Sequence, residues 1–436
     1  MHMQTDVRKG NSSMIDPYRP YSRAYQWGIL LLFSLLFFLI TAATFTSLGV
    51  VLPSMIQELQ WSWSDAGLGF TLLGLACGLS SYLPAFFIRH WGVRATLLLG
   101  MLILAAGFGR LYSTHGIVAY FFGTTLLGIG FSFVATVPGT HVIGRLFEKQ
   151  SLAFGVYFTL GGLGGVVGPW IYFLAVNVWG SWRMHWGLCG ALLTGASLLT
   201  CLVLREGARE KAHAARVGQR LQAGTNQTIY RTMESWSAKQ ALRTWQFYVI
   251  AAAYASFLLC GITVNSFAVA HLTDRGFSAG IAASLLSAQA LINAFSRVGG
   301  GVFGEFVEPK KLLAGSLALI IVGVLALSAG NSWPTLILFT AGVGIGYGMT
   351  FLSTSILLSN YFGRGPYLEL FSVTNLISTV ACVSPFLAGA IKDRTGSFSM
   401  AFLMIAVVPV LVLLATLVMR PPRLPRDASH PQMATS

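Results

Sequence analysis

The chain has 436 residues, of which 55% are hydrophobic and only 10% are charged, and its mean hydropathy is +0.68. A soluble domain carries about 25% charged residues, so this composition excludes an ordinary soluble protein and indicates a polytopic membrane protein. The formal net charge of +14 could point to a nucleic-acid partner, but the distribution of the charges argues against one, as described below.

Twelve apolar stretches are long enough for a membrane-spanning helix, which needs about 20 mostly apolar residues. We therefore predict an all-α membrane protein with spans at 27–55, 65–88, 96–112, 116–144, 152–178, 184–204, 245–272, 279–304, 311–329, 333–361, 367–391 and 397–419. Six spans fall in 27–204 and six in 244–419, and polar tails at 1–26 and 420–436 and a polar linker at 205–243 complete the chain.

The basic residues lie mostly on one side of the predicted membrane. Of the 28 Lys and Arg residues, 22 lie in the tails, the linker and the loops on their side, and 5 lie in the opposite loops. Only Arg297 lies inside a predicted span and away from its ends. Because cytoplasmic loops carry an excess of Lys and Arg, we expect both termini in the cytoplasm, in a plasma or inner membrane. The net charge then reflects topology, and we expect no nucleic-acid partner.

The two halves contain a weak internal repeat at a constant offset, 344 minus 128, or 216 residues. Duplicated halves are typical of secondary transporters, whose substrate binds near the midplane between the repeats. The repeat therefore predicts two pseudo-symmetric six-helix bundles. The matching positions are Gly128-Ile-Gly130 with Gly344-Ile-Gly346, Pro169 with Pro385, and Arg94 with Lys310.

Two loops resemble the Gly/Asp/basic motif of the major facilitator superfamily. They read Ile88-Arg89-His-Trp-Gly92-Val-Arg94 and Gly301-Val-Phe-Gly-Glu305-Phe-Val-Glu-Pro-Lys310-Lys311. The first copy has Arg89 where the motif has its acid. The resemblance implies that charge pairs close a cytoplasmic gate, with Arg94, Glu305 and Lys310 as candidates. The alternative is that the basic residues only anchor the loops on the inner side.

A more specific resemblance covers nearly the whole chain and is strongest from the seventh to the eleventh span. Its motifs are Phe267-Ala-Val-Ala-His-Leu-Thr-Asp-Arg-Gly-Phe-Ser278, Asn293-x-x-x-Arg297-x-x-x-Gly301 and Gly344-Ile-Gly-Tyr-Gly348. They resemble the monocarboxylate transporters and their bacterial relatives, including the oxalate/formate antiporters. The resemblance implies alternating-access transport, with Arg297 binding the substrate carboxylate. It also implies that Asn293 replaces an aspartate used for proton coupling in the animal proteins.

The chemistry of Arg297 supports the same role independently. An arginine inside the bilayer costs at least ~2.5–3.5 kcal/mol, and the nearest acid along its helix is Glu305, two turns away. A guanidinium offers two parallel donors to a carboxylate, and one cation balances one negative charge, which favours monocarboxylates over oxalate. The alternative is an arginine that snorkels to the membrane surface.

Three further polar residues are candidates for contact with the substrate. Asn293 shares a helix face with Arg297, so it would bind the substrate or orient the guanidinium, unless it only bonds a neighbouring helix. Tyr347 in the tenth span and Asn375 in the eleventh could donate hydrogen bonds to the substrate. For both residues, ordinary packing inside the bundle is the alternative.

None of the 14 Asp and Glu residues lies in the middle of a predicted span, which counts against proton-coupled drug exporters and sugar symporters. Proton coupling itself stays open. Histidine titrates near neutral pH, so His141 in the fourth span is a candidate proton carrier, with a buried structural histidine as the alternative. His271, near the outer end of the seventh span, is either an outer gate residue or an interfacial one.

The sequence holds no nucleophile–base arrangement and no metal-ligand spacing of its five cysteines, so we expect neither an enzyme nor a cofactor. The predicted function is a carrier of small monocarboxylates, acting as a monomer in the lipid bilayer, with protons as a further candidate partner. The rival functions are an organic-anion exchanger of the oxalate/formate type, a drug exporter, and a sensor that does not transport.

Overall fold

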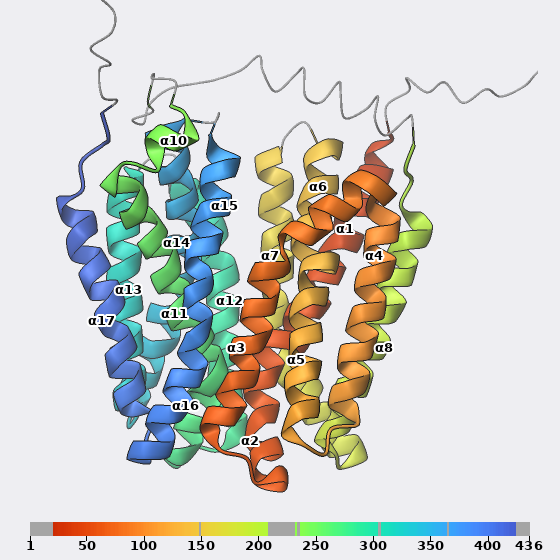
Figure 1. Ribbon diagram of the computed structural model, residues 1–436. Coiled ribbons are helices and arrows are strands. Elements are labelled where there is room, and N and C mark those ends of the chain that lie inside the picture. The colour runs from red at the N-terminus through yellow and green to blue at the C-terminus, as the bar shows by residue number, and fades with distance from the viewer. Residues whose placement is uncertain are drawn as a thin grey trace, which may run out of the picture.

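The computed structural model describes residues 21–147, 150–207, 232, 236–303, 307–363 and 366–423, so the tails and most of the predicted linker lie outside it. Within these residues the chain is helical, and the helices stand side by side in two bundles (Figure 1). The predicted fold class, an all-α membrane protein with two pseudo-symmetric bundles, is confirmed.

The first bundle contains helices α1 (Arg23–Thr41), α2 (Ser47–Leu59), α3 (Trp63–Ser80), α4 (Tyr82–Tyr112), α5 (Ile117–Phe131), α6 (Val137–Leu146), α7 (Gln150–Trp179) and α8 (Trp182–Val203). A π-helical turn joins α1 to α2 at Ala42–Thr46, and a second joins α5 to α6 at Ser132–Thr136. Each pair therefore forms one continuous span, as the predicted spans 27–55 and 116–144 require.

The second bundle contains α11 (Trp245–Asp274), α12 (Ala279–Phe303), α13 (Pro309–Ala329), α14 (Trp333–Phe362), α15 (Tyr367–Ser378), α16 (Ser384–Thr395) and α17 (Ser399–Val418). The 3₁₀ turn Thr379–Val383 joins α15 to α16. The short helix α10 (Ala238–Ala241) lies at the same end of the molecule as the start of α1 and the end of α17 (Figure 1). We call this end the linker end and the opposite one the distal end.

Eleven helices of the described residues are long and apolar enough to cross a membrane. Helix α3 is not among them, because its 18 residues include Asp65 and several glycines, which lower its hydropathy. It is nevertheless the second span, because it packs inside the protein along α16: a Cβ at Gly67 would overlap the carbonyl oxygen of Pro385. With α3, the described residues contain the twelve predicted spans.

The boundary between the second and third spans lies within the predicted interval between 88 and 96, but it is a kink rather than a polar loop. Helix α4 begins at Tyr82 and continues through this region with a kink at Gly92, where φ is +85°. A residue with a side chain rarely adopts this backbone conformation. The part of α4 before Gly92 continues from α3, and the part after it forms the third span, so the kink lies where the prediction placed the boundary.

The internal repeat corresponds to equivalent packing in the two bundles. Gly128 on α5 lies against the backbone of Leu73 on α3, and Gly344 on α14 lies against the backbone of Gln289 on α12. Gly130 packs on Leu104 of α4, as its counterpart Gly346 packs on Ile320 of α13. The fourth helix of each half therefore contacts the second and third helices of that half through the same two glycines.

The basic pair of the repeat is also equivalent. The guanidinium of Arg94 donates to the carbonyl oxygen of Leu204, just beyond the sixth span of the first bundle. The ammonium of Lys310 donates to the carbonyl oxygen of Leu417, at 3.0 Å, near the end of the sixth span of the second bundle. Each bundle thus ties its third span to its sixth at the linker end.

Substitution of Gly67 tests the packing of α3 on α16 between the two bundles. We expect Gly67→Ala to lower the apparent melting temperature of the purified protein, because overpacking at a close helix contact costs about 1–3 kcal/mol. Gly109→Ala is the matched control, because a Cβ at Gly109 meets no atom within 4 Å and alanine favours a helix by about 1 kcal/mol over glycine. Equal melting temperatures of the two variants would contradict the close contact.

Candidate functional site

Arg297 is held by close packing of α12 on α14. A Cβ at Gly344 would lie 2.9 Å from the carbonyl oxygen of Gln289, and one at Gly348 would lie 2.5 Å from that of Asn293. Ser296, beside Arg297, donates a hydrogen bond to the carbonyl oxygen of Gly344 at 3.3 Å. The glycines of α14 therefore let α12 approach closely, as expected for helix pairs in lipid, and fix the position of Arg297.

The guanidinium of Arg297 has neutral neighbours. Its Nε donates to Oδ1 of Asn293 at 3.2 Å, and its Cζ lies 5.0 Å from the ring centroid of Phe351. The hydroxyl groups of Tyr347 and Tyr254 lie close enough to interact with it electrostatically. In the part of the chain that the structure describes, no carboxylate forms an ion pair with Arg297.

The structure brings Asn293, Arg297 and Tyr347 together. The ring of Tyr347 lies against Gly261 of α11 and contacts Phe257 edge-on, with 4.7 Å between the ring centroids. Its orientation is therefore set by α11. Asn375 on α15 instead donates to the carbonyl oxygen of Phe371 in its own helix at 3.1 Å, and no contact joins it to Arg297 among the described residues.

Sequence analysis missed the aromatic residues of this site. Phe351 lies one turn beyond Tyr347 on α14, so the helical period alone could have indicated it. Phe158 on α7 lies 5.9 Å from Phe351, between ring centroids, although it belongs to the other bundle. Tyr254 on α11 lies 6.1 Å from Phe351. No local sequence signal distinguishes these two from the other aromatic residues of the spans.

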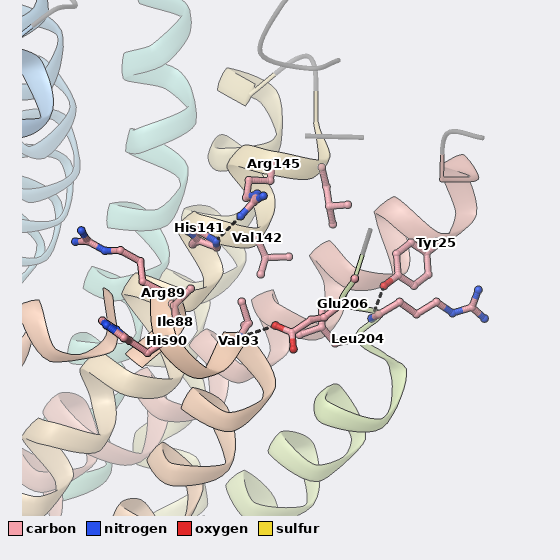
Figure 2. A pocket seen from close by; sticks show the side chains of 14 residues that line it. Tyr25, Ile88, Arg89, His90, Val93, His141, Val142, Arg145, Leu204 and Glu206 are labelled. Atoms are coloured by element: carbon pink, nitrogen blue, oxygen red, sulfur yellow. Dashed lines mark hydrogen bonds between the residues drawn. The ribbon is translucent and has the colours of Figure 1, made fainter. Parts of the chain in front are cut away.

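His141 lies apart from Arg297, in a cavity of about 340 Å³ at the linker end of the first bundle (Figure 2). Its Nε2 is 3.2 Å from Nη1 of Arg145. A guanidinium can only donate, so Nε2 of His141 accepts this hydrogen bond and is unprotonated. Protonation of His141 at Nε2 would break its contact with Arg145.

The first copy of the sequence motif has Arg89 in place of its acid. The same cavity contains a carboxylate from another part of the chain, that of Glu206. Glu206, which follows the sixth span, accepts hydrogen bonds from the backbone N–H groups of Val93 and Arg94 (Figure 2 shows the bond to Val93). The carboxylate thus caps the N-terminus of the helix that follows the Gly92 kink, where negative charge is stabilising. Glu305, the acid of the second motif copy, lies outside the described residues.

His271 lies at the distal end of α11, inside the second bundle. It is 1% exposed, and its Nε2 lies 2.9 Å from the carbonyl oxygen of Leu327 on α13. Its ring also packs edge-on against Phe402 of α17 at 5.2 Å. These contacts tie His271 to helices of its own bundle and place it away from Arg297.

The two bundles are joined at the distal end by a carboxylate. Asp393 on α16 accepts hydrogen bonds from the backbone N–H groups of Trp63, at 3.0 Å, and Ser64, at 2.8 Å, at the start of α3. Nearby, the backbone N–H of Phe386 donates to Thr71 Oγ1 at 3.3 Å. We call these contacts of Asp393 the distal latch, because they connect opposite bundles.

Comparison with known proteins agrees with this arrangement. The family model of the Major Facilitator Superfamily matches residues 33–304 and again residues 255–434. The chain therefore belongs to the Major Facilitator Superfamily and is a multi-pass membrane transporter. A crystal structure of a mutant of the peptide transporter POT in complex with sulfate has a TM-score of 0.68 over 89% of this chain and 94% of that one. Their sequences are 14% identical, so this likeness shows the fold alone.

The sequence relatives agree with the resemblance seen in the motifs. An uncharacterized transporter of Bacillus subtilis, YycB, is 26% identical, covering 86% of this chain and 87% of its own length. Monocarboxylate transporter 4 of Rattus norvegicus is 25% identical, covering 87% and 80%. The oxalate:formate antiporter of Oxalobacter formigenes is 24% identical, covering 61% and 64%. The similarity to monocarboxylate transporters and an oxalate:formate antiporter is confirmed.

The distal latch can be tested by thiol labelling. A carboxylate at a helix N-terminus contributes on the order of 1 kcal/mol, and a change of this size alters the ratio of two conformations about fivefold. In purified protein with its five cysteines replaced by alanine, we expect Asp393→Ala to speed labelling of Thr71→Cys by a hydrophilic maleimide several-fold.

The matched control for this test is Asp274→Ala. It removes an ion pair with Lys392 at the same end but within the second bundle, so it should leave the labelling rate of Thr71→Cys unchanged. If both variants accelerated labelling equally, the contacts of Asp393 across the bundles would have no special role.

Proposed function

We propose that this transporter carries small monocarboxylate anions by alternating access, with the carboxylate bound by Arg297. The observation that carries the proposal is the guanidinium of Arg297 between the bundles. Among the residues that the structure describes, its hydrogen-bond partner is Asn293 and no acid pairs with it. A transported anion supplies the missing charge, and it leaves the site in each cycle. Relatives named as monocarboxylate transporters support the same substrate class.

The geometry also supports a division of roles around the substrate. Asn293 holds Nε of Arg297, which leaves the two Nη groups to form parallel hydrogen bonds with a carboxylate. Tyr347, held against Gly261, offers a hydroxyl donor near the same charge. Asn375 lies on α15, one turn beyond Phe371, whose ring is 5.8 Å from that of Tyr254. We assign Asn375 to the periphery of the substrate site, where it has no contact with Arg297 among the described residues.

Alternating access needs contacts that break and re-form at each end of the protein. We propose the distal latch for one end, and the gate residues Arg94, Glu305 and Lys310 for the other. We further propose that both termini are cytoplasmic, as the distribution of basic residues favours. The linker end then faces the cytoplasm, and the distal latch closes the outer end.

Substitution of Arg297 tests the central assignment. Two charge-assisted hydrogen bonds contribute about 1.5–3 kcal/mol each, so we expect Arg297→Ala to reduce uptake of the cognate monocarboxylate about 100-fold or more. Arg297→Lys keeps the charge but loses the parallel donors, so we expect it to lose at least about tenfold in affinity. Uptake would be measured in proteoliposomes with a labelled acid.

Arg110→Ala serves as the control, because Arg110 is exposed at the distal end of α4. We expect it to transport like the wild type. Wild-type uptake by Arg297→Ala, in protein that folds and inserts normally, would overturn the assignment.

His141 offers a separate test of proton coupling. Because Nε2 of His141 accepts from Arg145, we propose a structural role in the first bundle rather than proton transfer. Glutamine can accept the same hydrogen bond but does not titrate, so His141→Gln should keep the wild-type dependence of uptake on pH from 5 to 8, the range in which a histidine titrates. A flattened pH profile in this variant would instead make His141 a proton carrier.

A further inference from the structure

The free side of Arg297 is bordered by an aromatic ring. Nε is engaged by Asn293 at 3.2 Å, and among the described residues the two Nη groups donate to no protein atom. Phe351 lies beside the guanidinium, 5.0 Å from Cζ to the ring centroid. A carboxylate bound by the Nη groups would therefore hold the rest of its molecule close to Phe351.

Rings from both bundles meet at Phe351. On the side of the first bundle, Phe158 lies 5.9 Å from Phe351, and Phe37 of α1 lies 6.1 Å from Phe158, both between centroids. On the side of the second bundle, Tyr254 lies 6.1 Å from Phe351 and 5.8 Å from Phe371. We call these five residues the aromatic wall.

Most side chains of the aromatic wall are not fully buried. Phe37, Phe158, Phe351 and Phe371 are all partly exposed, whereas Tyr254 is only 6% exposed. Exposed aromatic surface is unfavourable in water and is stabilised when another apolar group covers it. Aromatic rings in contact prefer offset or edge-on arrangements, and the pair Phe158–Phe351, with an interplanar angle of 61°, leaves ring faces open to a third ring.

Small residues leave room next to this wall. Gly162 lies one turn from Phe158 on α7, and a Cβ at this position would meet only the Cβ of Ala294 on α12, at 3.7 Å. Ala294 in turn precedes Arg297 by three residues on the same helix, so it lies on the same face. Where α7 meets α12, the residues near Arg297 are thus a glycine, an alanine and aromatic rings.

We propose, on the basis of the carboxylate role of Arg297, that the substrate is an aryl-substituted monocarboxylate whose ring lies against Phe351 and Phe158. Its carboxylate pairs with the Nη groups of Arg297, and its ring covers rings from both bundles. A small aliphatic acid satisfies the charge but leaves the aromatic wall uncovered. A dicarboxylate brings a second negative charge, and among the described residues no second cation contacts Asn293, Arg297 or the aromatic wall.

The experiment measures dissociation constants of the purified protein for two matched pairs of acids, by thermal shift and by inhibition of counterflow in proteoliposomes. The pairs are phenylacetate with acetate, and phenylpyruvate with pyruvate. We expect the aryl acid of each pair to bind about tenfold more tightly, the scale of an aromatic contact plus ring burial. Phenylethanol, which has the ring without the carboxylate, should not bind.

Phe158→Leu tests the ring contact directly. We expect it to lower the ratio of the two affinities within each pair about threefold or more, because leucine is apolar but has no ring. Phe295→Leu is the control, because Phe295 is 63% exposed on another face of α12, and it should keep the wild-type preference.

The outcomes separate this inference from the proposed function. Equal affinities within each pair, or an unchanged preference in Phe158→Leu, would overturn the aryl assignment, while loss of binding in Arg297→Ala would still support a monocarboxylate carrier. Binding of phenylethanol, together with wild-type affinities in Arg297→Ala, would overturn both and favour an exporter of apolar compounds.

Discussion

The rest of the structure depends on the guanidinium of Arg297, a cation between two apolar bundles that forms no ion pair within the described part of the chain. Removing such a charge from water costs several kcal/mol unless partners replace the hydration. Here the replacement is partial, since Asn293 accepts one hydrogen bond and Phe351 offers a ring face. An internal carboxylate would stabilise the cation fully, but it would also compete with an anionic substrate. The incomplete neutralisation is consistent with the reversible anion site that we propose at Arg297.

Close helix packing is what makes this position of the cation rigid. Gly344 and Gly348 allow α14 to pack closely on α12. The ring of Tyr347, which extends from α14, packs against Gly261 of α11. Three helices of the second bundle are thus fixed relative to one another around Arg297. The first bundle contributes Phe158, and its position relative to Arg297 changes whenever the bundles move. The charge and the ring of Phe351 beside it stay with one bundle, and the ring of Phe158 that contacts Phe351 comes from the other.

Patterns local to the sequence predicted much of the fold and part of the site. Apolar length gave the spans, the offset between Gly128 and Gly344 gave the repeat, and the helical period placed Asn293 beside Arg297. The contacts that were missed join residues far apart in the chain, such as Asp393 with Trp63 and Glu206 with Val93. Such partners are set by how whole helices pack, and a single sequence carries no signal for them. The end of the second span was predicted close to Gly92, but its form was not, because one backbone angle rather than a polar loop ends the span.

The ties at the linker end have a consequence for how the protein is assembled. Arg94 binds the backbone at Leu204, and Lys310 binds it at Leu417, so each half of the chain secures its own third and sixth helices. Neither tie needs residues of the other half. The halves are therefore equipped to insert and fold one after the other during synthesis, and two separately expressed fragments, divided within residues 208–231, should recombine into one complete protein.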